Sequence, residues 1–273
     1  MPLVTMYEDV FNGEEIASKV AESLGFRCVG RSTLVEAVQQ YGVPEAKLHE
    51  IMQRGQHWWD VWLQHLRPYR IALQAAMCDL AKDGKLVYHG HIGHELLPGV
   101  SHVLRVVLTA PMDFRIDYVS VTQNLDREHA RHFIEQVDSA RSRRLMVLFG
   151  RDWRDAESYD LVVNLKMGTA AIVSTITHVA QLEVFAETPE SRVTFDNVSL
   201  ANRAQTVLLR SRAFGDLMVD VSADKGEIIV SGWRPRSISE AQMMDLLKAV
   251  PGVTRVTNNT METPRATWEG AVD

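Results

Sequence analysis

Residues 84–111 read GKLVYHGHIGHELLPGVSHVLRVVLTAP. This stretch contains two short apolar runs, 85–89 and 104–108, and glycine or proline stands beside each of them. Runs of this length with such residues at their ends are typical of buried strands. The sequence therefore predicts two strands, with a loop rich in glycine and histidine after the first.

Strands and helices alternate on either side of this stretch. Further short apolar runs predict strands at 2–7, 26–29 and 161–164. Amphipathic or charged segments predict helices at 13–24, 32–40, 53–79 and 126–148. Such alternation favours an α/β fold, in which helices cover both faces of a mostly parallel sheet.

The C-terminal part of the chain has a different pattern. It predicts the order helix, strand, strand, helix, strand, at 200–212, 217–222, 227–233, 239–249 and 253–258. Gly226 in the sequence Asp224-Lys225-Gly226 favours a hairpin turn, because glycine accepts positive φ. We predict a first domain at 1–186, an irregular linker at 187–198, a small αββαβ domain at 199–262 and a tail at 263–273.

Composition narrows the classes of function. The 273 residues are 46% hydrophobic and 23% charged, with a formal net charge of -6. An acidic balance argues against a nucleic-acid partner and against a membrane partner. Cys28 and Cys78 have no CxxC spacing, which favours reduced core thiols. The N-terminus lacks the pattern of a signal peptide and no apolar run has the length of a membrane span, so we expect a cytoplasmic protein.

Arginine is the clearest chemical signal in the first domain. Eight arginines follow the strand at 104–108: Arg115, Arg127, Arg131, Arg141, Arg143, Arg144, Arg151 and Arg154. Guanidinium groups bind phosphate oxygens in bidentate geometry. The alternative is a solvated helix face on which these arginines pair with nearby acids such as Glu128 and Asp138.

Two other clusters have structural alternatives. His89, His91 and His94 could ligate a metal, but spacing fixes no carboxylate or cysteine partner, and we predict no metal site. Polar histidines at a strand end are the alternative, and His91 could line a pocket there. A second cluster, Trp58, Trp59, Trp62 and His65, could stack on a base, although helical spacing favours packing.

The order of several short motifs in the first domain resembles the cytidylate kinase-like family, a branch of the P-loop nucleoside monophosphate kinases. The motifs are Gly13-Glu14-Glu15-Ile16-Ala17, Gly90-His91-Ile92-Gly93, Val106 to Arg115 with its Ala-Pro-x-x-x-Arg ending, Asp138-Ser139-Ala140-Arg141, Gly150-Arg151-Asp152-Trp153 and Tyr159 to Asn164. The resemblance implies a P-loop-kinase-like sheet and, in an active member, ATP and Mg²⁺.

The resemblance also implies roles for single residues. Arg115 and Arg141 would be catalytic, in or beside the lid over the transferring phosphoryl group. The phosphate- and nucleotide-binding residues would be Asn12, Gly13, Glu14, Arg31, His91, Arg144 and Arg151.

The chain departs from the family pattern at three places. A phosphate cradle needs several glycines so that backbone N–H groups can converge on the anion, and here the stretch is Val10-Phe11-Asn12-Gly13 between carboxylates. The pattern GxxxxGK[ST], which supplies the phosphate lysine and the magnesium hydroxyl, is absent. Gly30-Arg31 replaces an Asp-Arg pair, and Gly90-His91 replaces a Gly-Arg pair.

The C-terminal domain resembles the BON family. The resemblance rests on Gly226 to Gly232, Ala249 to Val253 and Val256-Thr257-Asn258. It implies ligand or phospholipid binding and protein interaction, and the lack of an export signal favours interaction with a protein partner or self-association.

Together these features favour a degenerate kinase-like protein that senses a nucleotide and acts through its BON domain. The alternative is an active nucleoside monophosphate kinase of the cytidylate type.

Overall fold

The computed structural model describes residues 2–8, 13–42, 59–211, 213–214, 217 and 219–263, without the side chains of residue 8 and residues 59–66. The chain divides into two compact units, residues 1–195 and 196–273.

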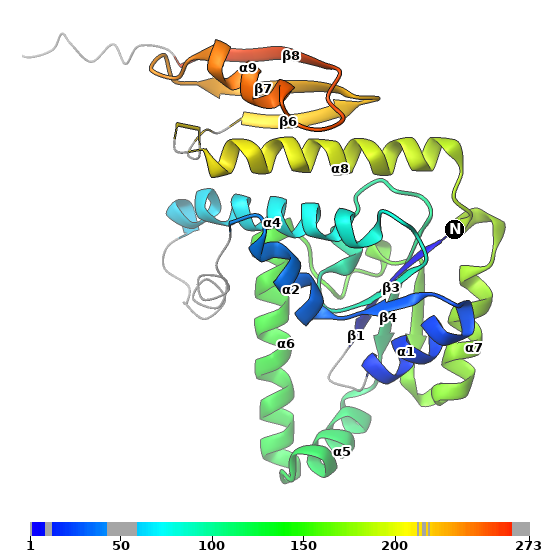
Figure 1. Cartoon of the computed structure of the whole chain (residues 1–273). Coiled ribbons are helices and arrows are strands. Elements are labelled where there is room, and N and C mark those ends of the chain that lie inside the picture. Colours follow the sequence, from blue (N-terminus) through cyan, green and yellow to red (C-terminus); the bar gives the residue numbers. More distant parts are fainter. Residues whose placement is uncertain are drawn as a thin grey trace, which may run out of the picture. The chain divides into compact units, whose positions relative to one another are not determined.

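A five-stranded sheet forms the centre of the first unit (Figure 1). Its strands are β1 (Leu3–Glu8), β2 (Arg27–Val29), β3 (Leu86–His89), β4 (Val103–Thr109) and β5 (Leu161–Asn164). They lie in the order β2-β3-β1-β4-β5, and every neighbouring pair is parallel. The predicted α/β class is thus confirmed, and the two runs in residues 84–111 are β3 and β4.

Helices α1 (Gly13–Leu24) and α7 (Thr169–Ala180) cover one face of this sheet. Met6 and Val106 are paired in register and therefore point to the same face. They pack with apolar residues of both helices in one buried cluster, which includes Ile16, Ala17 and Val20 from α1 and Ile172 and Ile176 from α7. Burying branched side chains on both sides of this interface stabilises the unit.

Helices α2 (Arg31–Gln39), α4 (Trp59–Ala81) and α6 (Arg127–Phe149) lie on the other side of the sheet (Figure 1). Leu34 of α2, Leu73 of α4 and Tyr88 of β3 line one small cavity together with an α6 residue. All three side chains are almost fully buried. This face carries the residues of the candidate site.

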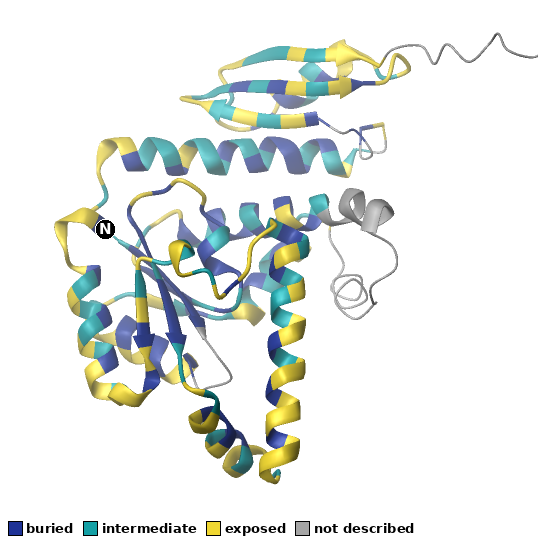
Figure 2. Cartoon of the chain, turned by 180° about the vertical axis from the view of Figure 1, so that it is seen from behind, coloured by how far each residue is buried: buried dark blue, intermediate teal, exposed yellow. Residues whose placement is uncertain are grey.

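A helical hairpin of α5 (Met112–Gln123) and α6 projects from the sheet, and Figure 2 shows many exposed residues along it. Asn124 ends α5 in the left-handed conformation, and the Asp126 side chain caps α6 by accepting from the His129 N–H at 2.9 Å. We did not predict α5 or α7. Short turns of 3-10 helix complete the unit: η1 (Gly93–Glu95), η2 (Ala156–Ser158), η3 (Leu165–Met167) and η4 (Glu183–Phe185).

The predicted irregular linker at 187–198 is wrong in its secondary structure. Helix α8 runs without a break from Pro189 to Arg210, and the division between the two units falls within it. Proline is favourable in the first turn of a helix, where its missing N–H costs nothing. Thr188 and Ser191 cap this end reciprocally, each side-chain oxygen accepting the other's N–H at 3.1 and 2.9 Å.

The second unit contains a three-stranded sheet and two helical segments. Strands β6 (Val219–Asp224), β7 (Glu227–Arg234) and β8 (Arg255–Glu262) lie in that order, with β6 antiparallel and β8 parallel to β7. Helix α9 (Glu240–Lys248) and residues of α8 from Leu200 onward bury one face of the sheet. Gly226 has φ of 92° in the β6–β7 turn, as its position in the sequence predicted.

In the part of the chain that the structure describes, no single helix has both the length and the apolar character to cross a membrane. Thr169–Ala180 and Glu183–Arg210 pass that test only as a pair, with a bend of 69° between them.

Candidate functional site

Arginine and histidine side chains from three parts of the chain converge on the α2–α4–α6 side of the first sheet. Arg31 at the start of α2, Arg144 of α6 and His91 after β3 line a cavity of about 20 Å³, of the order of one water molecule. Arg141, one helical turn before Arg144, also acts electrostatically on His91 and Arg144. We call Arg31, Arg141, Arg144 and His91 the cationic cluster.

Close packing of glycine against Tyr88 fixes the position of His91. A Cβ atom at Gly90 would lie 2.5 Å from the Tyr88 hydroxyl oxygen, and one at Gly93 would lie 2.4 Å from Tyr88 Cδ1. Tyr88 is 1% exposed, so its ring has no room to move away. Only glycine therefore allows the chain after β3 to fold over Tyr88 and to bring His91 to the arginines.

His91 is uncharged in this environment. Burial is the main cause, and the neighbouring Arg141, Arg144 and Arg31 add to it, so that the pKa of His91 is lowered to about 2. His94, which is also buried, has its pKa lowered to about 4 by burial and by Arg105. At neutral pH the charge of the cationic cluster is thus carried by its arginines.

The arginines of the cluster repel one another. Burial, together with Arg31 and Arg141, lowers the pKa of Arg144 to about 10. The Arg144 Nε atom is buried and has no hydrogen-bond partner among the described residues. Among those residues no carboxylate lies within ion-pair distance of Arg31 or Arg144. An anion bound by these side chains would relieve this repulsion, which is the electrostatic requirement of a phosphate site.

Arg115 lies in a different environment from that cluster. Its guanidinium donates to both carboxylate oxygens of Asp138 at 2.9 and 2.6 Å, and both side chains are 6% exposed. This pair joins α5 to α6 and neutralises the charge of Arg115. Asp138 precedes Arg141 by three residues on α6, so the pair also holds the helix that carries Arg141 and Arg144.

The other predicted site residues are more scattered. Gly13 and Glu14 begin α1, where Gly13 is buried and Glu14 is exposed. Arg151 is exposed after α6 and acts on Glu95. Asn12 lies outside the described residues, as do Trp58 and the side chains of Trp59, Trp62 and His65.

Sequence reasoning missed an aromatic cluster beside the site. Tyr7, near the end of β1, stacks on Trp153 with ring centroids 5.2 Å apart and also packs against His91 at 5.5 Å. Tyr159 and His94 lie on the edges of the same tyrosine. Burial is the largest cause that raises the pKa of Tyr159. The available signal was the alternation of β1, which puts Tyr7 on the face opposite Met6.

Metal ligands do not gather in the described part of the chain. No group of three or more histidine, cysteine, aspartate or glutamate side chains there is placed to hold an ion. His91 and His94 instead both pack against the ring of Tyr7.

Burial of two neutral histidines predicts a loss of stability in acid. The unfolded chain has histidine pKa values of about 6.5, against about 2 and about 4 for His91 and His94 when folded. Above pH ~6.5 both states are neutral and the histidines contribute nothing. Below it the unfolded chain binds more protons, and each histidine lowers the free energy of unfolding by up to about 1.4 kcal/mol per pH unit. Between pH ~7 and pH ~5 we expect a loss of about 3 to 4 kcal/mol from the pair.

Urea unfolding at both pH values measures this loss. The variant with His91→Gln and His94→Gln should lose correspondingly less over the same interval. Equal losses in the variant and in the unmodified protein would show that these histidines are not the cause.

A parallel sheet in this order, with helices on both faces and an arginine cluster beside β3, defines an α/β protein of the P-loop kinase type. Comparison with known proteins agrees. The sequence pattern of the cytidylate kinase-like family matches residues 12–167. The chain therefore belongs to the cytidylate kinase-like family.

Individual proteins show the same relationship. The chain is 28% identical over 163 residues to a cytidylate kinase of Ignicoccus hospitalis, covering 59% of this chain and 88% of that protein. It is 26% identical over 153 residues to a cytidylate kinase of Methanopyrus kandleri, covering 55% and 76%. Among solved structures, an uncharacterized protein from Eubacterium ventriosum has a TM-score of 0.50 at 14% identity, covering 66% of this chain and 97% of that one, and it supports the fold alone.

Proposed function

We propose that this protein senses a nucleotide: the cationic cluster binds the phosphate of a nucleoside monophosphate, and the chain has lost ordinary phosphoryl transfer. One observation carries the proposal. Arg31 and Arg144 line one cavity together with a neutral His91, and none of the described residues that line it is a carboxylate. The guanidinium groups of Arg31 and Arg144, which have no carboxylate within ion-pair distance among the described residues, offer the charge and the donors that a phosphate dianion requires.

In this proposal the other residues have supporting roles. Arg31 and Arg141 would donate to the phosphate together with Arg144. Arg115 would be a positioning residue that acts through Asp138 on α6. Arg151 would attract the anion from its exposed position after the same helix.

The start of α1 does not fit a magnesium triphosphate. Gly13 is followed by Glu14 and Glu15, whose carboxylates are exposed in the first turn of the helix. A lysine and a hydroxyl would be needed at such a place to hold the phosphates and the metal ion. Carboxylates there repel a polyphosphate, and this supports a role in sensing. In this proposal the start of α1 therefore binds neither ATP nor Mg²⁺.

In this proposal the second unit is a BON domain, through which nucleotide binding would affect a partner. Its order of helix, strand, strand, helix and strand, and its tight turn at Gly226, support this assignment. We propose that it binds a protein partner or a second copy of the chain.

An active cytidylate-type kinase is the second candidate. It is favoured by the two curated relatives, both of which are named cytidylate kinase. In that case ATP and Mg²⁺ would be required, and Arg115 and Arg141 would act in catalysis.

A turnover assay separates the two candidates. Purified protein is incubated with CMP and Mg-ATP, and the formation of CDP is followed beside a blank without protein. We expect no CDP above the blank. Steady formation of CDP that the Arg141→Ala variant abolishes would overturn the sensing proposal and establish the kinase.

A further inference from the structure

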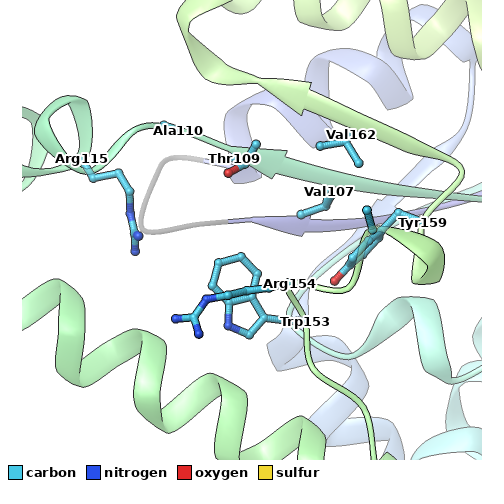
Figure 3. Close-up of a pocket in the computed structure, with 9 residues that line it drawn as sticks. Val107, Thr109, Ala110, Arg115, Trp153, Arg154, Tyr159 and Val162 are labelled. Atoms are coloured by element: carbon cyan, nitrogen blue, oxygen red, sulfur yellow. The ribbon is translucent and has the colours of Figure 1, made fainter.

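A second and larger hollow lies on the same face of the sheet, towards its β5 edge (Figure 3). Its volume is about 270 Å³. Among the described residues, it shares no lining residue with the cavity of the cationic cluster. Val107 and Val162, which are paired in register on β4 and β5, form its floor, and the loop from Trp153 to Tyr159 forms one side.

The polar groups of this hollow include two guanidinium groups. Arg115 and Arg154 line it, as do Thr109 and Tyr159, and none of the described residues that line it is acidic. Asp138 neutralises Arg115. Arg154 has no ion pair among the described residues and lies over the Trp153 ring at 5.1 Å. Among the described residues, the hollow therefore has one positive charge that no carboxylate compensates, and an anionic group is the complement to it.

The remaining walls are apolar and fixed in place. Ala110, Ala156 and the two valines present aliphatic surface. Trp153 is 7% exposed and stacks on Tyr7 with an angle of 13° between the ring planes. A fixed aromatic wall opposite aliphatic side chains suits a flat apolar body, and ligand pockets commonly combine such walls with a few polar groups.

The geometry points to a second ligand site, which takes a small organic anion with a flat apolar body, such as an aromatic carboxylate. The body lies over Val107 and Val162, and the anionic group meets Arg154. This site is separate from the proposed nucleotide site, because neither Arg154 nor Val162 belongs to the cationic cluster.

The test uses 4-fluorobenzoate as the probe and ¹⁹F NMR of the full chain as the readout. Val162 is 51% exposed, so Val162→Trp places a large side chain over the hollow at little cost to folding. Arg154→Gln removes the charge. The matched controls are Val121→Trp, at a valine that is 83% exposed on α5, and Arg131→Gln, at an exposed arginine on α6.

We expect the 4-fluorobenzoate signal to broaden and shift on titration. Val162→Trp and Arg154→Gln should each weaken this binding by about tenfold or more, while both controls bind as the unmodified protein does. Neutral 4-fluorobenzamide should bind more weakly than the benzoate. The inference is overturned if the benzoate does not bind folded protein, if the two site variants bind it unchanged, or if inorganic phosphate displaces it completely by occupying the cationic cluster.

Discussion

Replacing Asp138 with alanine is expected to lower the free energy of unfolding by about 3 to 5 kcal/mol, because it breaks the buried Arg115–Asp138 pair. The physical reason is desolvation. Without its carboxylate, the Arg115 guanidinium would stay buried between α5 and α6 with no countercharge. Urea unfolding followed by circular dichroism at neutral pH measures the change.

A double variant distinguishes desolvation from packing. Arg115→Met with Asp138→Leu removes both charges and keeps apolar volume, so it should recover most of the stability that Asp138→Ala loses. A single variant that unfolds at the same urea concentration as the unmodified protein would show that Arg115 reaches water. Arg115 would then be available to act at the site directly.

Replacing Arg144 with methionine is expected to weaken the binding of CMP by about 10- to 100-fold, the usual effect of losing a charged hydrogen bond. The same substitution should raise the stability of the protein without ligand by about 1 kcal/mol, because it removes a half-buried cation that Arg31 and Arg141 repel. Calorimetry measures the first effect, and thermal unfolding without nucleotide measures the second.

A substitution that weakens CMP binding but raises the stability of the ligand-free protein identifies a residue whose charge serves the ligand and not the fold. The control is Arg143→Met, at the exposed neighbour on the same helix, which should change neither quantity appreciably. If Arg144→Met destabilises the protein and leaves CMP binding intact, Arg144 is a structural residue and the cluster is not a phosphate site.

The sequence allowed the class of fold to be predicted because its signals are local. Short apolar runs between glycine and proline gave β3 and β4, and the turn at Gly226 gave the β6–β7 hairpin. The second half of α8 was predicted as a helix, but its first half was predicted as a linker because residues 187–197 are polar, contain Pro189 and lack sustained periodicity. A proline in the first turn of a helix is nevertheless favourable. The capping partners of α8, Thr188 and Ser191, are visible in the sequence in retrospect.

The candidate site was only partly predictable, because side chains meet there across long separations in the sequence. Arg31, His91 and Arg144 come from three different elements, and no spacing rule brings them together. Likewise, sequence alone did not distinguish Arg115, which is neutralised by an acid, from Arg144, which has no ion pair among the described residues. The stacking of Trp153 on Tyr7 could not be predicted, because the two residues are far apart in the sequence. Trp153 entered the sequence analysis only as part of a motif.

Calorimetric titration with CMP and, separately, with Mg-ATP tests the central claim most directly. We predict that CMP binds at one site, that cytidine without its phosphate binds far more weakly, and that Mg-ATP gives no heat of binding. Folded protein that gives no heat with CMP would contradict the assignment of the cationic cluster to a phosphate. Tight binding of both CMP and Mg-ATP would instead contradict the loss of the donor site and restore the kinase.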